Sequence, residues 1–379
     1  MSYLPPTVWA FPHCPTARAA IDWNVLLKDF DWLRVLKDCP QDPIYHAEGD
    51  VLTHTQMVCE ALIALPGWHA LSESDRSVLF AATLLHDVAK PQTTQLDSDG
   101  RLTAKGHGHQ GAKMARRILW DMETPFYHRE AIVNLIQYGS LPLWFWDKPN
   151  PQQSVIKASQ MVCCEWISLL AEADVRGRQC YDQQTLLDSV GFFREFCQEQ
   201  GCLDRPKPFA SDHSRFMYFQ KEHPSPDYDA FDDTCFDVIL MSGLPGAGKD
   251  SWIREFRSDW PVISLDGLRS HMKIRPDAPQ GKVVNQGKMM AREYARKQQS
   301  FVWNATNISQ QLRSGLVNLV TSYRAKVHLV YLEAPWPELV RRNRSRTNPV
   351  PQKVLDKLRN RLEVPIPIEA HTVEWINSP

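Results

Sequence analysis

The stretch GLPGAGKDSW, residues 243–252, constrains the fold more than any other part of the sequence. Its glycines and lysine have the spacing G-x-x-x-x-G-K. The apolar run FDVILMS before it predicts a strand, and the segment after it predicts a helix. The residues of this pattern are Gly243, Gly246, Gly248 and Lys249. Such glycines let backbone N–H groups and a helix N-terminus face a phosphate, and the lysine adds a positive charge. The sequence therefore predicts a phosphate-binding loop.

Apolar runs alternate with helical segments through the rest of the C-terminal part. PVISL, FVWNA and AKVHLVYLEA have the character of buried strands, and the segments between them have helical character. Strands that alternate with helices build a parallel sheet covered on both faces. Residues 236–379 are therefore predicted to form one α/β domain around the phosphate-binding loop.

The N-terminal part has a different pattern. From about residue 20 to residue 200, apolar residues recur at helical spacing, as in DRSVLFAATLLHDVA. Residues 201–235 are rich in proline, aspartate and aromatic residues, which predicts an ordered connector. A chain of 379 residues is too long for one typical core. We therefore expect a multidomain protein, with an all-α domain over 1–200, this connector, and then the α/β domain.

Composition narrows the classes of partner and compartment. The formal net charge is -1, so contacts with nucleic acid must come from local basic patches. The nine cysteines have no paired metal-binding spacing, and no signal peptide precedes them, which favours reduced thiols in a cytoplasm. No stretch of the sequence has the apolar length that a bilayer-spanning helix needs. The expectation is a cytoplasmic protein with no membrane partner.

Asp250 follows the loop lysine, where many phosphate-binding loops have a serine or threonine that binds Mg²⁺. A carboxylate close to a polyphosphate is unfavourable unless a cation lies between them. We therefore expect ATP or another NTP to bind with Mg²⁺, and Asp250 to act on the ion or its waters. The alternative is that Asp250 only caps the helix. Ser251 lies about 100° further round the helix and does not take the same place.

Asp266 and Arg269 follow the strand PVISL in the pattern D-x-x-R. Ligands bind at the C-terminal edge of a parallel sheet, so Asp266 is placed to accept a proton from a hydroxyl and Arg269 to hold an acceptor phosphate. Further along, Arg342 and Arg346 stand one helical turn apart and are predicted to close over a triphosphate as a lid. These residues together predict phosphoryl transfer to a hydroxyl group.

These motifs together resemble a 5′-hydroxyl polynucleotide kinase over most of residues 236–379. The resemblance also includes NATN at 304–307 and the tail VPQKVLDKLRNRLEVP. It implies roles in phosphoryl transfer for the following residues: Asp266 as general base, Lys249 as phosphate clamp, Arg269 as acceptor or transition-state contact, and Arg342 or Arg346 as lid arginine. With the other motifs in place, Asp250 is interpreted as a subfamily variation in metal handling.

The N-terminal half carries a second set of chemical groups. LLHDVAK, residues 84–90, contains the adjacent pair His86 and Asp87 at the end of an apolar helix. His54 lies upstream and Asp174 downstream on other predicted helices. Two imidazoles and two carboxylates on separate helices suit a divalent transition metal. Such an ion activates water toward a phosphoester.

The order H…HD…D resembles the HD-domain metal-dependent phosphohydrolases over about residues 45–180. The resemblance implies that the first metal is bound by four residues: His54, His86, Asp87 and Asp174. It further implies that Asp87 bridges to a second ion, that Lys90 contacts the substrate phosphate, and that His107 serves the second metal. Another histidine is expected where Gly139 and Ser140 stand. We therefore predict one firmly held metal, with His109 or His128 as alternative ligands.

The whole chain resembles the bacterial HD–polynucleotide kinase fusion family. The resemblance implies that the kinase part phosphorylates 5′-OH ends of RNA or DNA with NTP and Mg²⁺. It implies that the HD part removes 2′,3′-cyclic or 2′-phosphate from RNA 3′ ends, preparing ends for an RNA ligase. The nucleic acid is expected to be held by phosphate contacts and aromatic stacking, with four connector residues as candidates: Arg215, Phe216, Tyr218 and Phe219.

Two other functions stay open from the sequence. The first is a P-loop kinase of a small molecule or nucleotide-sugar with a non-catalytic HD domain. The second is a nucleic-acid-binding ATP switch without end chemistry. The D-x-x-R pattern with R-N-x-x-R disfavours the first, and the presence of Asp266 disfavours the second.

Overall fold

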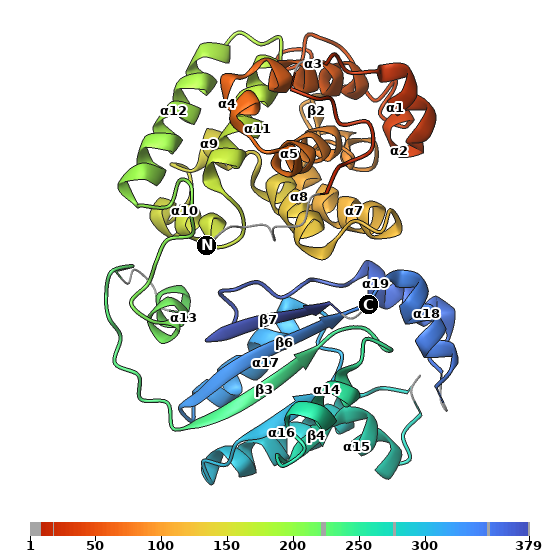
Figure 1. Cartoon of the computed structure of the whole chain (residues 1–379), viewed down its shortest axis with the longest axis vertical. Helices are drawn as coiled ribbons and strands as arrows, with labels where there is room; N and C mark the ends of the chain where they lie inside the picture. Colours follow the sequence, from red (N-terminus) through yellow and green to blue (C-terminus); the bar gives the residue numbers. More distant parts are fainter. Residues whose placement is uncertain (1–8, 18, 221–224, 276–277, 347–348, 378–379) are drawn as a thin grey trace. The chain divides into compact units, whose positions relative to one another are not determined.

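The computed structural model describes residues 9–17, 19–220, 225–275, 278–346 and 349–377. It divides into two compact units, Met1–Pro208 and Phe209–Pro379 (Figure 1). The first unit is helical and the second contains a five-stranded parallel sheet, so the predicted multidomain fold is confirmed. None of the helices formed by the described residues is long and apolar enough to cross a membrane.

The first unit is a helical assembly with one short hairpin. Its helices are α1 (Trp23–Asp29), α2 (Asp31–Arg34), α3 (Val51–Ala64), α4 (Pro66–Ala70), α5 (Glu73–Leu85), α6 (Lys90–Thr93), α7 (His107–Asp121), α8 (Phe126–Tyr138), α9 (Leu141–Trp144), α10 (Pro151–Ser159), α11 (Cys164–Arg176) and α12 (Gln183–Glu199). The hairpin pairs β1 (Gln95–Leu96) with β2 (Leu102–Thr103) in antiparallel fashion, which the sequence had not indicated.

Helix α5 forms the centre of the first unit. Every residue from Ser77 to Leu85 is buried, and α3, α8 and α11 pack against this helix. The Ser72 side chain caps its first turn by accepting a hydrogen bond from the Asp75 N–H, and the Asp50 side chain does the same for α3. Because α5 is buried on all sides from Ser77 onward, the residues that follow its C-terminal end lie in the interior of the unit.

The second unit is a parallel sheet with flanking helices. The strands are β3 (Phe236–Ser242), β4 (Val262–Ser264), β5 (Phe301–Asn304), β6 (Ala325–Glu333) and β7 (Thr372–Asn377), in the order β4-β5-β3-β6-β7. The helices are α13 (Asp212–Gln220), α14 (Lys249–Phe256), α15 (Leu265–His271), α16 (Gly281–Arg296), α17 (Gln310–Thr321), α18 (Trp336–Arg344) and α19 (Gln352–Asn360). All strand pairs are parallel, so the segments after β3, β4 and β5 meet at one edge.

The predicted connector is divided between the two units. The division falls after Pro208, and α13 belongs to the second unit; residues 221–224 lie outside the described part of the chain. Phe216 and Tyr218 are buried, and the Phe216 ring stacks on His371 with centroids 4.2 Å apart. The proposal that these two rings bind nucleic-acid bases is therefore wrong, because they pack inside the protein.

A buried ion pair stabilises the second unit and leads to a prediction. Nε and Nη2 of Arg313 contact the two carboxylate oxygens of Glu369 at 2.6 and 2.8 Å, and both side chains are almost fully buried. Replacing Glu369 with alanine leaves a guanidinium without its carboxylate in the interior. We expect Glu369→Ala to lower the free energy of unfolding by about 3–5 kcal/mol, measured by denaturant titration. The double variant Arg313→Met/Glu369→Leu should recover most of this loss; a single variant as stable as wild type contradicts the prediction.

Candidate functional site

The four residues predicted to bind one metal lie together in the first unit. His54 comes from α3, His86 and Asp87 follow α5, and Asp174 comes from α11. Nε2 of His54 is 3.1 Å from Oδ1 of Asp174 and 3.8 Å from Oδ2 of Asp87. Nε2 of His86 is 3.2 Å from the same Asp87 oxygen. One ligand atom each of His54, His86 and Asp87 lies within 4.8 Å of the other two, close enough for a single ion, and Asp174 adjoins this group through His54. Their role as ligands stays a prediction.

The arrangement of His86 and Asp87 fits a metal ion. Nδ1 of His86 lies 2.7 Å from the Thr83 carbonyl oxygen and donates to it, so the lone pair of Nε2 faces Asp87. His86 Nε2 and Asp87 Oδ2 are buried, and neither makes a hydrogen bond of normal geometry within the described residues. Two imidazoles with two carboxylates match a divalent transition metal, which when bound supplies a Lewis acid and an activated water.

Two cationic side chains accompany the carboxylates. Nζ of Lys90 lies 2.7 Å from Asp87 Oδ2 and donates to Gln41 Oε1 at 2.6 Å. Arg178 donates from Nε to Asp174 Oδ1 at 3.2 Å and makes a second contact through Nη2. Burial acts to raise the pKa of Asp87, but the neighbouring His86 and Lys90 hold it well below its usual range. Both carboxylates are therefore ionised and available to a cation at neutral pH.

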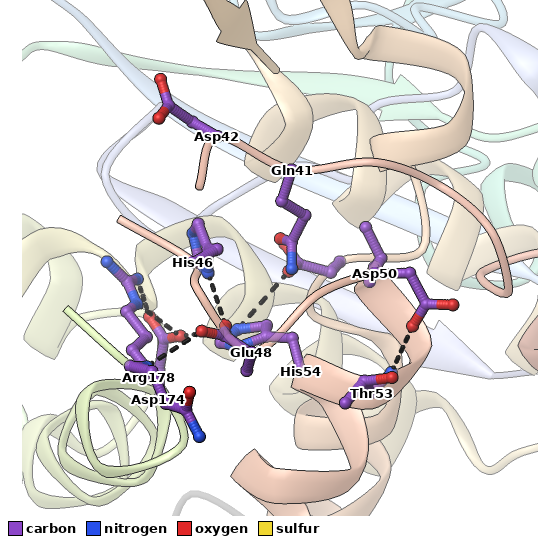
Figure 2. A network of polar contacts seen from close by, with 12 residues as sticks. Gln41, Asp42, His46, Glu48, Asp50, Thr53, His54, Asp174 and Arg178 are labelled. Carbon is purple, nitrogen blue, oxygen red and sulfur yellow. Dashed lines mark hydrogen bonds and ion pairs between the residues drawn. The ribbon is translucent and has the colours of Figure 1, made fainter. Parts of the chain in front are cut away.

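Glu48 and His46 belong to this site, and sequence reasoning missed them (Figure 2). The Glu48 side chain is fully buried, and its Oε1 lies 2.8 Å from Nδ1 of His46 and 2.8 Å from Nδ1 of His54. Its other oxygen accepts a hydrogen bond from the Gln179 N–H at 2.9 Å. The contact on Nδ1 of His54 leaves Nε2 directed at Asp87 and Asp174. Glu48 therefore orients a predicted ligand from behind, as carboxylates behind metal-binding histidines do.

This arrangement predicts the effect of removing the Glu48 charge. Glu48→Gln keeps the size of the side chain but no longer supplies a carboxylate to His54. We expect metal affinity to fall by about 10- to 100-fold, measured by metal titration of the purified chain. Glu60→Gln is the matched control, because Glu60 stands on the same helix α3 and contacts Trp23 rather than the histidines. Equal affinities in the two variants contradict the role of Glu48.

The titration of His86 predicts a pH dependence of metal binding. Burial acts to lower the pKa of His86, but the adjacent Asp87 carboxylate raises it above its ordinary value. A metal ion binds neutral imidazole. Below this raised pKa, the His86 side chain must therefore lose a proton before the ion binds. Metal affinity is expected to be flat above the pKa and to fall about tenfold per pH unit below it. Titrations between about pH 5 and 8 check this, and an affinity independent of pH contradicts it.

Of the three histidines considered as ligands of a second metal, His107 and His109 lie at the predicted site and His128 does not. Nε2 of His107 lies 3.6 Å from Asp87 Oδ1, and its Nδ1 donates to the Ala104 carbonyl at 2.8 Å. His109 lines a cavity that is also lined by His86, Asp87 and His107. His128 is fully buried against Ser74 and Trp9 and does not line the cavity, so this alternative is wrong. His107 is the better placed partner for Asp87.

Gly139, at the position where a histidine is expected, is in close contact with Leu135 and Leu170. It follows α8 with helical backbone angles and lines the cavity. A Cβ added there would lie 3.1 Å from the Leu135 carbonyl oxygen and 3.3 Å from Cδ2 of Leu170. A larger side chain therefore requires Leu170 to move. The close packing at the end of α8 therefore suits a glycine at the position where the HD pattern expects a histidine.

The metal-site residues open into a cavity of about 660 Å³. Besides the groups above, it is lined by polar and aromatic side chains, among them Gln41, Tyr45, Lys105, Gln137, Trp144 and Asp182. Pockets of this size accommodate a small organic ligand rather than an isolated ion. The first unit thus combines a metal-type cluster with space for a substrate.

The phosphate-binding loop of the second unit has the predicted geometry. It connects β3 to α14, and its three glycines adopt positive φ angles. At Gly243, φ is 138° and an added Cβ would lie 2.4 Å from the Leu332 carbonyl oxygen, so any other residue would clash with β6. Gly248, with φ of 101°, is the N-cap of α14. The loop therefore presents backbone N–H groups at a helix N-terminus.

Lys249 is held over the loop by its own backbone. Nζ donates to the carbonyl oxygens of Gly243 and Leu244 at 2.9 and 3.0 Å. Burial, aided by the charge of Arg346 and opposed by Asp250 and Asp266, lowers the pKa of Lys249 to about 8. A phosphate with its negative charges would favour the protonated form. The position suits a side chain that clamps phosphates.

Asp250 does not cap the helix, so that alternative is wrong. Gly248 is the N-cap of α14 and Asp250 lies in the first turn, where its charge is favourable to the helix dipole. Oδ1 of Asp250 accepts a hydrogen bond from Nδ2 of Asn304, at the end of β5, at 2.6 Å. The side chain of Asp250 is therefore fixed beside the loop, at a place where it can act on a cation. Ser251 follows on the exposed side of the helix.

The NATN segment supports the loop from the neighbouring strand. Asn307 donates from Nδ2 to the Met241 carbonyl at 2.7 Å, and its own carbonyl accepts from Ser242 Oγ at 3.0 Å. The N–H of Gly243 donates to the Thr306 carbonyl at 3.0 Å. These bonds cross from β5 to β3 and hold the start of the phosphate-binding loop. Asn304 and Asn307 therefore both help to hold the loop. Their spacing along the chain does not reveal this role.

Asp266 and Arg269 lie in the first two turns of α15, directly after β4. Oδ1 of Asp266 accepts from Nη1 of Arg269 at 2.6 Å, and Oδ2 is 3.9 Å from Nη2 of Arg346. The Asp266 side chain is 69% exposed and thus accessible to a substrate hydroxyl. The pair shares the sheet edge with the phosphate-binding loop, as predicted from strand order.

Helix α18 lies beside the loop. A Cβ on Gly246 would come within 3.1 Å of the Leu339 carbonyl and 3.5 Å of Cβ of Arg342. Nε of Arg342 contacts Glu338 within the helix. Asn343 is buried, and its side chain bonds both the N–H and the carbonyl oxygen of Val350. Arg342 and Arg346 are therefore carried close to the phosphate site, while their role as a lid stays a prediction.

Comparison with known proteins identifies both domains. Residues 51–144 match a sequence model of the HD domain family, and residues 238–365 match a model described as an AAA domain. The first range contains the predicted metal residues except Asp174, and the second contains every residue predicted for phosphoryl transfer. The layout implied by the resemblance to HD–kinase fusions, an HD domain followed by a P-loop kinase-like domain, is confirmed.

The curated and solved relatives are distant. The L-seryl-tRNA(Sec) kinase of Methanococcus maripaludis is 21% identical over 135 residues, which are 34% of this chain and 53% of that protein, so the chain spans about half the length of this relative. A structure provisionally described as a kinase of Chloroflexus aurantiacus is 16% identical, with 38% of this chain and 89% of that chain covered and a TM-score of 0.33. Kti12 of Chaetomium thermophilum in complex with ADP-AlF3 is 15% identical, with 37% and 88% covered and a TM-score of 0.29.

Proposed function

We propose that this chain, an HD domain followed by a P-loop kinase-like domain, is an enzyme that repairs nucleic-acid ends. The kinase domain transfers the γ-phosphate of an NTP to 5′-OH ends of RNA or DNA. The HD domain hydrolyses 2′,3′-cyclic or 2′-phosphate at RNA 3′ ends. The observation that carries the proposal is the position of Asp266 and Arg269 at the same sheet edge as the phosphate-binding loop.

The groups of the kinase domain suit transfer to a hydroxyl. Asp266 accepts the proton of the attacking hydroxyl as its oxygen bonds to the γ-phosphorus. The bond from that phosphorus to the bridging oxygen breaks, and the nucleoside diphosphate leaves with the electron pair. Lys249 and the loop N–H groups neutralise the phosphates. Asp250, fixed by Asn304, is the residue that would hold Mg²⁺ or its waters.

The groups of the HD domain suit hydrolysis of a phosphoester. Water adds to the phosphorus, one ester P–O bond breaks, and the sugar oxygen takes the proton. Lys90 and His107 lie beside Asp87 and are placed to bind non-bridging phosphate oxygens. His46 faces the cavity, and burial lowers its pKa although contact with Glu48 opposes the shift, so it is neutral at physiological pH.

The similarity to the archaeal L-seryl-tRNA(Sec) kinase supports an RNA-linked acceptor. That protein is a kinase of L-seryl-tRNA(Sec), so its acceptor is carried on an RNA. The match covers about half of that protein. It favours a hydroxyl acceptor attached to nucleic acid over a free small molecule. A functional link to an RNA ligase follows from the proposed products, which are 5′-phosphate and 3′-hydroxyl ends.

The test uses the purified full chain with two RNA substrates. One is a 5′-OH oligonucleotide with Mg²⁺ and ATP labelled at the γ-phosphate, and the other carries a 2′,3′-cyclic phosphate and is supplied with a divalent transition metal. Label on the RNA 5′ end, absent in Lys249→Ala, supports the kinase half. Loss of the cyclic phosphate supports the HD half. ATP binding without transfer to RNA or DNA refutes the proposal and favours a small-molecule kinase or an ATP switch.

A further inference from the structure

Three large aromatic side chains are exposed around the cavity of the HD domain. Tyr45 and Trp144 line the cavity and are 38% and 49% exposed. Tyr181 is 79% exposed and stands between Cys180 and Asp182, which also line it. The rings of Tyr45 and Tyr181 are 6.3 Å apart with an angle of 41° between their planes. The mouth of the cavity is therefore flanked by aromatic faces.

The three residues come from separate parts of the chain. Tyr45 precedes α3, Trp144 is the last residue of α9, and Tyr181 lies between α11 and α12. Trp68 and Phe80 of this unit are fully buried, whereas Trp146 and Phe192 are exposed but do not line the cavity. The fold thus leaves three aromatic rings partly in water around one cavity. Single exposed aromatics are ordinary, but a group at a cavity mouth indicates a ligand.

The position of the charges in the cavity indicates which part of a ligand enters. Lys90 and Arg178 lie in its interior, each beside a carboxylate of the metal cluster, and Lys105 lines it on the exposed side together with Asp42 and Asp182. Cationic groups inside with flat aromatic groups outside suit a ligand that has a phosphate at one end and planar rings behind it. The end of a single nucleic-acid strand has this composition.

We propose that Tyr45, Tyr181 and Trp144 stack on the bases of the last nucleotides of a single RNA strand whose terminal phosphate reaches His86 and Asp87. This inference rests on the proposed function of the HD domain, because it takes the substrate to be a strand end. Stacking is tolerant of sequence, since every base has a π face. The HD site is therefore expected to accept strands of any terminal base and to reject a duplex end.

The experiment measures binding rather than turnover. The probe is a short RNA with 2-aminopurine as its 3′-terminal base and a 3′-hydroxyl, so that it resembles the product and is not consumed. Fluorescence of 2-aminopurine is quenched when the base stacks. Wild type should quench the probe, and Trp144→Ala or Tyr45→Ala should weaken its affinity by about 5- to 100-fold. Trp144→Phe retains an aromatic face and should keep most of the affinity.

Two controls separate stacking from damage to the site. Phe192→Ala removes an aromatic side chain that is 56% exposed on α12 but does not line the cavity, and it should leave the affinity unchanged. Inorganic phosphate has no base, so its binding, measured by displacement of the probe, should be equal in wild type and Trp144→Ala. Metal content equal to wild type shows that the cluster is intact in each variant.

The outcomes distinguish this inference from the proposed function. Unchanged affinity and quenching in Tyr45→Ala and Trp144→Ala, with the wild type active on cyclic-phosphate RNA, overturn the stacking site alone. Wild type that quenches the probe but leaves the cyclic phosphate intact refutes the hydrolysis and supports the strand-binding site. Wild type that does not bind the probe overturns the stacking site, whatever its activity on small phosphoesters.

Discussion

Asp266→Asn is expected to lower kcat for transfer of phosphate to a 5′-OH end by about 10²- to 10⁴-fold, with little change in ATP affinity. Asparagine has the same shape but cannot take the hydroxyl proton. The carboxylate is exposed, it lies beside Arg269 and Arg346, and it shares the sheet edge with Lys249. Its effect should therefore appear in the chemical step and not in nucleotide binding. Single-turnover transfer of labelled γ-phosphate measures the first, and nucleotide titration measures the second.

The control for this variant is Asp259→Asn, on the exposed turn after α14 and away from the sheet edge that carries the loop. It should have wild-type activity. The acidic limb of the pH–rate profile is a second readout, because it reports the ionisation of the base and should disappear in Asp266→Asn. An asparagine variant with wild-type kcat, or with its profile unchanged, would falsify the assignment of Asp266 as the base.

Asp87→Asn is expected to lower hydrolysis of the RNA 3′ phosphate by about 10³-fold or more and to abolish tight metal binding. One oxygen of Asp87 contacts both His86 and Lys90, and the other is 3.6 Å from His107. The amide replaces an anionic ligand with a neutral one and also leaves the Lys90 cation without its carboxylate. Metal content of the purified variant and its rate on 2′,3′-cyclic phosphate RNA measure the two effects.

Asp188→Asn is the matched control for Asp87→Asn, since Asp188 is on α12, where its exposed carboxylate accepts a hydrogen bond from Gln184. Kinase activity should be unchanged in both variants, because the kinase residues belong to the other compact unit. In the same way, Asp266→Asn should leave 3′ hydrolysis unchanged. Loss of both activities in either variant contradicts two independent sites and indicates a folding defect shared by the units.

Much of the kinase domain is contiguous in the sequence, which is why it was predictable. The phosphate-binding loop, its strand and its helix are neighbours along the chain, and the geometry of Gly243 and Gly248 follows from local backbone requirements. Asp266 was placed correctly at the sheet edge because parallel strands end on the same side. The sequence by itself thus determined the order of the domains, the loop, and the edge that carries the chemistry.

Tertiary structure decided the features that join residues far apart. Asp250 and Asn304 are 54 positions apart and His54 and Asp174 are 120 apart, so no local pattern predicts that they bond. The same holds for Glu48 behind His54, which only the packing of the segment before α3 onto the site reveals. Such contacts depend on how helices and strands pack.

Burial was the other property that only the tertiary structure decided. Phe216, Tyr218 and His128 have residue types suited to binding, yet the packing of α13 and α8 places them in the interior. Tyr45 and Trp144 have the same residue types and stay exposed at the cavity. Residue type sets what a side chain can do, and the packed chain decides whether a ligand can reach it. For this reason the motifs were determined by the sequence alone, while the choice among equally suitable side chains was made by the fold.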